Sequence, residues 1–150
     1  QAGQTRQEQE LQSHSAGSLD TTFGNNGIVI TDLSNNMYDQ PYSVVIDSLD
    51  RIVVAGHAGS FGNLGSAVVR YNTDGSLDTT FGTDISGMVI TNLGGSNDYA
   101  FSLAIDSSQR IVVAGYTNAN GNDDFAVVRY NENGSFNIRS IRTLLLNSCL

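Results

Sequence analysis

Short runs of β-branched apolar residues alternate along this chain with polar segments rich in Gly, Asn, Asp and Ser. Runs of about six such residues, bounded by turn residues, are typical of β-strands, and their Val, Ile and Thr content disfavours helix. Several runs, such as VVI and IVVA, are apolar at every position, which indicates strands covered on both faces. We therefore predict an all-β, antiparallel fold. The expected strands are 27–33, 42–47, 51–57, 66–72, 87–93, 101–106, 110–116 and 125–131.

The same phrases occur twice in the chain. GSLDTTFG stands at 17–24 and again at 75–82, and RIVVAG and AVVRYN are also each found twice. The period is about 59 residues, a length typical of propellers and other stacked arrays. Four short strands in each repeat match the content of one propeller blade. The two repeats are therefore expected to form two antiparallel four-stranded blades of a partial β-propeller.

The repeats divide the chain into three parts. Residues 1–16 are polar and rich in Gln and Ser, so they are expected to form a flexible arm. Residues 17–136 hold the two repeats, at about 17–74 and 75–133. Residues 137–150 read NIRSIRTLLLNSCL where a third LDxxFG phrase is expected, so they are interpreted as a divergent tail.

The repeated residues resemble those of the delta-60 repeat family. The shared patterns are Leu-Asp-x-x-Phe-Gly, Gly-x-Val, Ile-Asp-x-x-x-Arg-Ile-Val-Val-Ala-Gly and Ala-Val-Val-Arg-Tyr-Asn-x-x-Gly-Ser. This family is bacterial, has a predicted β-propeller fold and usually occurs in tandem arrays on large secreted or surface proteins. The resemblance implies an architecture and an extracellular or cell-surface location. It implies no activity and no catalytic residues.

Composition narrows the possible partners. The net charge of −8 opposes binding to nucleic acid or to anionic lipid, and no apolar run is long enough to insert into a membrane. The only cysteine, Cys149, has no internal partner for a disulfide. All seven basic residues are arginines, and four stand at repeated positions. Arg51, Arg70, Arg110 and Arg129 are expected either to hydrogen-bond neighbouring carbonyls and carboxylates or to be solvated at strand ends.

Two repeated carboxylates are the candidates for catalysis. Asp47 and Asp106 precede equivalent hairpin turns, and paired carboxylates can carry out acid–base chemistry if they converge. The other interpretation is that they cap turns or pair with Arg51 and Arg110. The favoured function is a non-catalytic repeat scaffold or binding module, with no catalytic residues. The alternative is part of a propeller hydrolase or lyase with a carboxylate site at the mouth of its channel.

Two Asx-rich loops are candidates for metal binding. Asn72, Asp74 and Asp78 are spaced like ligands of a calcium loop, but the second copy has Asn137 in place of the last carboxylate. The loop 118–124 has an acid-free counterpart at 59–65. Both loops are therefore predicted to be turns, with no metal and no cofactor.

The remaining candidates are ring-bearing residues. His14 lies in the polar arm, and His57 has Tyr116 as its counterpart, which favours a position on an amphipathic rim. Four strand tyrosines either line a rim that binds a glycan or peptide, or pack between sheets. They are Tyr42, Tyr71, Tyr116 and Tyr130. The ligand itself is unknown from the sequence, and protein or glycan are the classes considered.

The phrase SLDTTFG is predicted to connect adjacent blades. Phe23 and Phe81 are expected to fill the seam between sheets, and Asp20 and Asp78 to cap the turn. Leu19 and Leu77 are expected to anchor the approach, and Gly24 and Gly82 to adopt positive φ. Two blades leave sheet faces uncovered, so the chain is expected to associate with itself or with further repeats.

Overall fold

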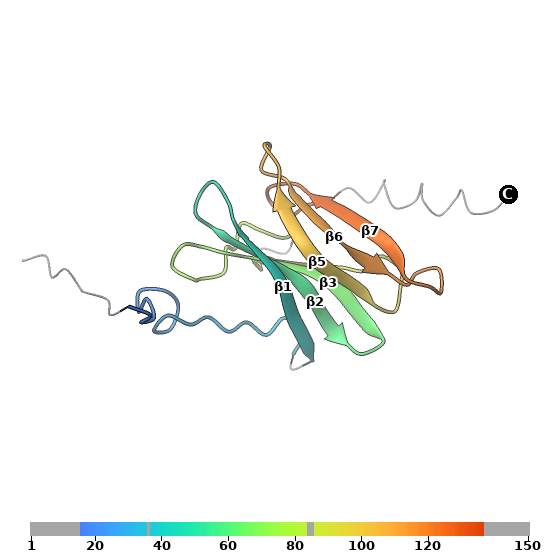
Figure 1. Cartoon of the computed structure of the whole chain (residues 1–150), viewed down its shortest axis with the longest axis horizontal. Helices are drawn as coiled ribbons and strands as arrows, with labels where there is room; N and C mark the ends of the chain where they lie inside the picture. The colour runs from blue at the N-terminus through green and yellow to red at the C-terminus, as the bar shows by residue number, and fades with distance from the viewer. Residues whose placement is uncertain (1–15, 36, 84–85, 137–150) are drawn as a thin grey trace, which may run out of the picture.

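A computed structural model of the chain describes residues 16–35, 37–83 and 86–136. These residues form two antiparallel sheets that pack face to face, and they contain no helix, hence none that could cross a membrane (Figure 1). The first sheet has the order β1-β2-β3-β4 and the second the order β5-β6-β7. The predicted all-β, antiparallel fold is confirmed. The strands are β1 (Tyr38–Ile46), β2 (Ile52–Ser60), β3 (Asn63–Tyr71), β4 (Met88–Thr91), β5 (Asp98–Ile105), β6 (Ile111–Thr117) and β7 (Asp124–Tyr130).

The two repeats form equivalent hairpins, as their shared sequence predicts. Val45 pairs with Val53 in the first, and Ala104 pairs with Val112 in the second. Each hairpin has a β-bulge at the same place, between residues 41 and 43 and between residues 100 and 102. The bulge lies in the first strand of each hairpin, β1 or β5. Side chains before and after it therefore point in directions that simple alternation would not give.

The prediction of a strand over 27–33 is wrong. In this segment only Ile28 takes part in isolated bridges, whereas its counterpart in the second repeat contains β4. The reason is that β4 pairs with β3 of the preceding repeat, with Val89 opposite Val68. The first blade therefore takes its fourth strand from the second repeat. Residues 27–33 belong to the first repeat, and within the described chain no strand equivalent to β3 precedes them.

The core lies between the two sheets. Val53, Ala55 and Val68 of the first sheet face Ile111 and its neighbours on the second. Phe81 and Val89 complete this layer from the connector and β4, and the Phe81 side chain has no exposed surface. The expectation that Phe81 fills the seam between sheets is confirmed.

The connector adopts the turn that its sequence predicts. The Asp78 carboxylate accepts hydrogen bonds from the backbone N–H and the hydroxyl of Thr80, at 2.9 and 2.6 Å. Gly24 and Gly82 have φ of 54° and 93°, in the left-handed region that glycine tolerates best. Leu77 is half-buried, but Leu19 in the first copy is largely exposed, so it does not anchor the chain as Leu77 does.

Candidate functional site

A buried arginine joins the two sheets. The Nε of Arg70 donates to Oδ2 of Asp78 at 2.8 Å, and its Nη1 donates to the backbone carbonyl of Glu132. The guanidinium carbon also lies 4.6 Å from the centre of the Phe81 ring. Arg70 and Asp78 are both buried, so little of this pair is exposed to water. It holds the connector and the second repeat against the first sheet.

Arg51 extends this contact into a cluster. Its Nε donates to Asp47 Oδ2 at 2.6 Å, and its two terminal nitrogens lie 3.5 Å from Asp78 and 3.3 Å from Glu132. We call these five residues, Asp47, Arg51, Arg70, Asp78 and Glu132, the ion cluster. The expected hydrogen-bonding role of the repeated arginines holds for Arg51 and Arg70, which act between blades.

The two arginines of the second repeat are less engaged. Arg110 pairs with Asp106 at 2.7 Å and is substantially exposed. Arg129 is paired on its backbone with Val112, but its side chain is exposed and makes no hydrogen bond or ion pair within the described chain. Their counterparts, Arg51 and Arg70, contact the following repeat. The contacts of Arg51 and Arg70 beyond their own repeat therefore have no counterpart in the described part of the second repeat.

The ion cluster holds its aspartates in the charged form. Burial by itself raises the pKa of Asp78, but hydrogen bonds from Thr80 and the charge of Arg70 lower it more, so its net pKa lies below 3.8. Burial likewise raises the pKa of Asp47, and hydrogen bonds from Arg51 and Leu49 bring its net pKa below 3.8. Both carboxylates are therefore stabilised as anions by folding.

Acid is expected to destabilise the protein through this cluster. Because the folded pKa of Asp78 is lower than the unfolded one, the unfolded chain takes up its proton first as the pH falls. The stabilisation is complete above the unfolded pKa, at about pH 5, and is lost as the pH falls below 3.8 through the lower pKa of the folded state. Thermal unfolding midpoints should therefore fall between about pH 5 and pH 3, and fall less in Asp78→Asn. An equal drop in both proteins would contradict this assignment.

The candidate catalytic carboxylates each serve their own hairpin turn. Asp47 Oδ1 accepts from the backbone N–H of Leu49 and of Arg51, at 2.8 and 3.0 Å. Asp106 makes the equivalent bonds, to Ser108 at 2.9 Å and to Arg110 at 3.1 Å. Both remaining oxygens accept from an arginine Nε. Oxygens occupied in this way position a turn and an arginine, which is the capping interpretation of the sequence.

The Asx-rich loops are closed by their own hydrogen bonds. Asp74 Oδ1 accepts from the N–H and the hydroxyl of Ser76, while Asp78 points toward Arg70. In the loop 118–124, the amides of Asn120 and Asn122 both donate to Asp124. Across the described residues, no three His, Cys, Asp or Glu side chains gather in a way that could hold a metal ion. His14 and Cys149 lie outside the described residues.

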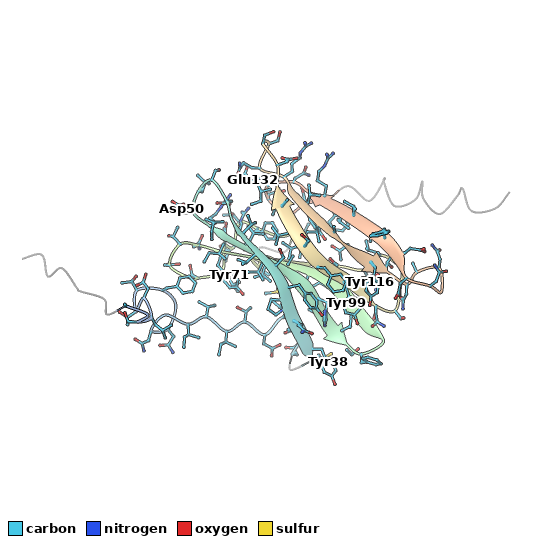
Figure 2. All side chains as sticks on the ribbon, in the orientation of Figure 1. Tyr38, Asp50, Tyr71, Tyr99, Tyr116 and Glu132 are labelled. Carbon is cyan, nitrogen blue, oxygen red and sulfur yellow. The ribbon has the colours of Figure 1, made fainter. Side chains whose placement is uncertain are left out.

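Five rings form a continuous cluster that spans both sheets. We call them the aromatic cluster: Tyr42, His57, Tyr99, Phe101 and Tyr116. The ring centres of Tyr42 and Phe101 are 4.9 Å apart, and those of His57 and Tyr99 are 4.7 Å apart. Rings of the first sheet therefore contact rings of the second. Tyr99 and Tyr116, labelled in Figure 2, lie on neighbouring strands of the second sheet. Their ring centres are 4.8 Å apart. Contacts of this length and tilt are typical of attractive aromatic pairs.

The bulges place the most exposed rings of this cluster. Tyr42 and Phe101 are the bulged residues of equivalent hairpins, and 39% and 44% of their side-chain surface remains exposed. His57 is buried beneath them, which contradicts the rim position expected from its exchange with Tyr116. Burial lowers the pKa of His57, and the charge of Asp39 offsets this only in part. The imidazole is therefore neutral at neutral pH.

The four tyrosines singled out by the sequence separate into two pairs. Tyr42 and Tyr116 belong to the aromatic cluster. Tyr130 is buried with its hydroxyl 2.7 Å from that of Thr91, and the Tyr71 hydroxyl donates to Thr31 at 2.8 Å, so this pair serves packing. Sequence reasoning missed Tyr99 and Phe101. Phe101 could have been found as the counterpart of Tyr42, but Tyr99 replaces Gln40 and carries no repeat signal.

A comparison with protein families matches part of each repeat to one family. Residues 50–81 and 109–137 match the family described as "Domain of unknown function (DUF5122) beta-propeller". The repeats are of the β-propeller type. The two matched segments run from the β1–β2 turn to the connector in the first repeat and over the same elements in the second. No curated protein matches the chain. The propeller repeats thus come with a known architecture and without an assigned activity.

Proposed function

We propose that this protein is a non-catalytic propeller-repeat module that acts by binding a ligand through the aromatic cluster. The observation that carries the proposal is the contrast between its polar and its aromatic groups. The aspartates and arginines at equivalent turns hold hairpins and blades together, as the bonds of Asp47, Asp106 and Arg70 show. The aromatic cluster leaves the rings of Tyr42 and Phe101 partly open to solvent.

The ligand that best fits this surface is a neutral glycan. Exposed aromatic faces offer a flat apolar surface to the C–H face of a sugar ring, and a tyrosine hydroxyl beside them can hydrogen-bond the sugar hydroxyls. Anionic polymers are disfavoured because the chain carries a net charge of −8. Location on a secreted or cell-surface bacterial protein belongs to the same proposal, and its support is the resemblance of the repeats to the delta-60 family.

Removing the two most exposed rings is expected to weaken glycan binding. The experiment screens the purified chain on an array of neutral glycans and measures the best hit by titration calorimetry. Two stacking contacts together are worth enough for the double variant Tyr42→Ala/Phe101→Ala to lose about tenfold in affinity. Phe61→Ala is the matched control, because Phe61 is an exposed ring of the β2–β3 hairpin outside the cluster. No binding by the unmodified chain, or equal binding by the double variant, would overturn the proposal.

A further inference from the structure

The second sheet lacks the strand that completes the first. In the first sheet, β4 covers the outer edge of β3 over four paired positions, from Ser66–Thr91 to Val69–Met88. β7 is the counterpart of β3, and within the described chain no strand pairs with its outer edge. Residues 137–150, which follow, do not contain the VIT sequence found in β4. An open edge of this kind is a template for strand addition.

That sequence does occur once more, at the opposite side of the molecule. Residues 28–31 read IVIT where β4 reads MVIT, and we call them the donor segment. Figure 1 shows the segment before β1 and strand β7 on opposite sides of the molecule. A single chain therefore cannot lay its own donor segment along its own β7.

The donor segment is already held in the position of a blade edge. The hydroxyl of Tyr71 bonds Thr31 just as that of Tyr130 bonds Thr91 of β4. The carboxylate of Asp39 accepts a hydrogen bond from the backbone N–H of Leu33, at 2.7 Å. The carboxylate of Asp98 accepts the equivalent bond from Leu93, two residues after β4. These bonds fix β4 against the second sheet and the donor segment against the first. The donor segment thus has the place of β4 but not its partner strand.

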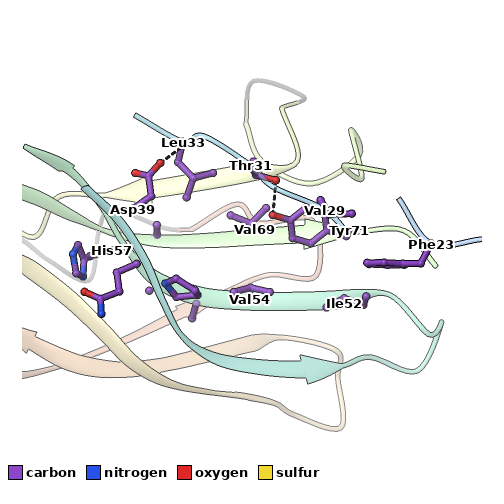
Figure 3. Close-up of a pocket in the computed structure, with 15 residues that line it drawn as sticks. Phe23, Val29, Thr31, Leu33, Asp39, Ile52, Val54, His57, Val69 and Tyr71 are labelled. Atoms are coloured by element: carbon purple, nitrogen blue, oxygen red, sulfur yellow. Dashed lines mark hydrogen bonds between the residues drawn. The ribbon is translucent and has the colours of Figure 1, made fainter. Parts of the chain in front are cut away.

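The space beneath the donor segment is incompletely filled. A cavity of about 330 Å³ lies between it and the first sheet, lined by apolar side chains that include Phe23, Ile52 and Val54 (Figure 3). Their counterparts Phe81, Ile111 and Val113 are all buried, because the first sheet packs on them. The lining residues therefore form the same kind of surface that, in the second repeat, is covered by a neighbouring blade.

The outer face of the second sheet has the complementary character. Phe125 is fully exposed and Val127 is 70% exposed. Their counterparts on β3, Ser66 and Val68, are buried in the contact between blades. Arg129 points to the same side with no partner in the described chain, while its counterpart Arg70 is bound by the next repeat. This face thus repeats the surface that the first sheet already uses for docking.

We infer that two copies of this chain dock head to tail, the donor segment of one copy adding as a fourth strand to β7 of the other. The register follows from β3 and β4, so Ile30 of one copy lies opposite Ala126 of the next and Val29 lies opposite Val127. A second copy is the occupant because the contact between the two blades of one chain shows that these surfaces fit each other.

Ring closure sets the size of the assembly. A closed propeller has 4 to 8 blades, so two-bladed chains close as dimers, trimers or tetramers. This docking uses the blade faces and not the aromatic cluster, and it does not depend on glycan binding. If the chain does not assemble, glycan binding can still be measured, and if it binds no glycan, its assembly can still be measured.

The size of the assembly in solution is the first test. Sedimentation velocity at micromolar concentration should show one closed species of two to four copies. Phe125→Asp and Val127→Arg should each yield a folded monomer, because both side chains are exposed in the single chain and are lost only from the docked face. Phe61→Asp, the matched control on the β2–β3 hairpin, should leave the assembly intact. A monomeric unmodified chain, or an assembly indifferent to both variants, would refute head-to-tail docking.

Cross-linking tests the register. In a Cys149→Ser background, Ile30→Cys and Ala126→Cys are placed on separate chains, which are mixed and oxidised. A disulfide should join the two chains, since facing residues of antiparallel strands lie within the reach of a disulfide. Ile30→Cys mixed with Ser107→Cys, which lies in an exposed turn, should cross-link at least tenfold more slowly. Equal rates for the two mixtures would mean that the copies associate through another surface, and the inference would be wrong.

Discussion

Replacing Phe81 with alanine is expected to lower the free energy of unfolding by about 3–5 kcal/mol. Phe81 has no exposed surface, packs among Val53, Val68 and Val89 in the core cluster, and lies under the guanidinium of Arg70. Its loss removes apolar contact and leaves a cavity that the two sheets cannot easily close, because both are fixed by strand pairing. Urea unfolding at a single protein concentration measures the change.

Two other phenylalanines calibrate this expectation. Phe23 occupies the same place in the first repeat but is only partly buried, because no blade precedes it within the described chain. Phe23→Ala should therefore cost clearly less when measured on the monomeric Phe125→Asp background. Phe61→Ala should change stability by no more than about 0.5 kcal/mol, since Phe61 is mostly exposed. If the three variants were equally stable, the connector would not be holding the blades together.

Breaking the pair between Arg70 and Asp78 is the second large effect. Asp78→Ala is expected to cost about 3–5 kcal/mol, because it leaves the buried Arg70 guanidinium without its carboxylate. This exceeds the roughly 1 kcal/mol that a turn cap alone contributes, which is what the sequence predicts for Asp78. The difference between the two values measures the contribution of the ion cluster.

The first repeat again supplies the control. Asp20 is exposed and accepts the same two hydrogen bonds from Thr22 that Asp78 accepts from Thr80. Asp20→Ala should therefore cost about 1 kcal/mol when measured on the monomeric Phe125→Asp background. A double variant Arg70→Met/Asp78→Ala should recover part of the loss, because it removes the unpaired charge. Equal costs for Asp20→Ala and Asp78→Ala would show that Asp78 acts only as a cap.

Local sequence predicted most of the secondary structure because hairpins are built from local signals. Six of the eight expected strands form the two equivalent hairpins with their third strands, and β4 lies within the seventh. The remaining one, over 27–33, fails although its residues almost repeat those around β4. A strand needs a neighbour to accept its hydrogen bonds, and whether one exists depends on the preceding repeat rather than on the strand itself.

The sequence predicts only part of the aromatic cluster. Tyr42 and Tyr116 were among the candidates, but so were Tyr71 and Tyr130, which pack between layers. The rings come together because bulges in β1 and β5 rotate Tyr42 and Phe101 onto a common surface. A bulge is a change in the register between two strands, here between β1 and β2 and between β5 and β6, and hydrophobic patterning along one strand does not reveal it.

The sequence by itself determined the repeat, the all-β class, the hairpin turns and the burial of Phe81, since each depends on residues close in the chain or on the repetition itself. Tertiary structure decided which side chains act between blades. Arg70 and Arg129 stand in identical local sequences, AVVRYN, yet one is buried in the ion cluster and the other is exposed. Part of the reason is local, because Arg70 binds Asp78 and the equivalent position after Arg129 is Asn137. The rest is tertiary, because Arg70 also binds the carbonyl of Glu132, 62 residues away at the end of the second repeat, and no later repeat stands in the described chain.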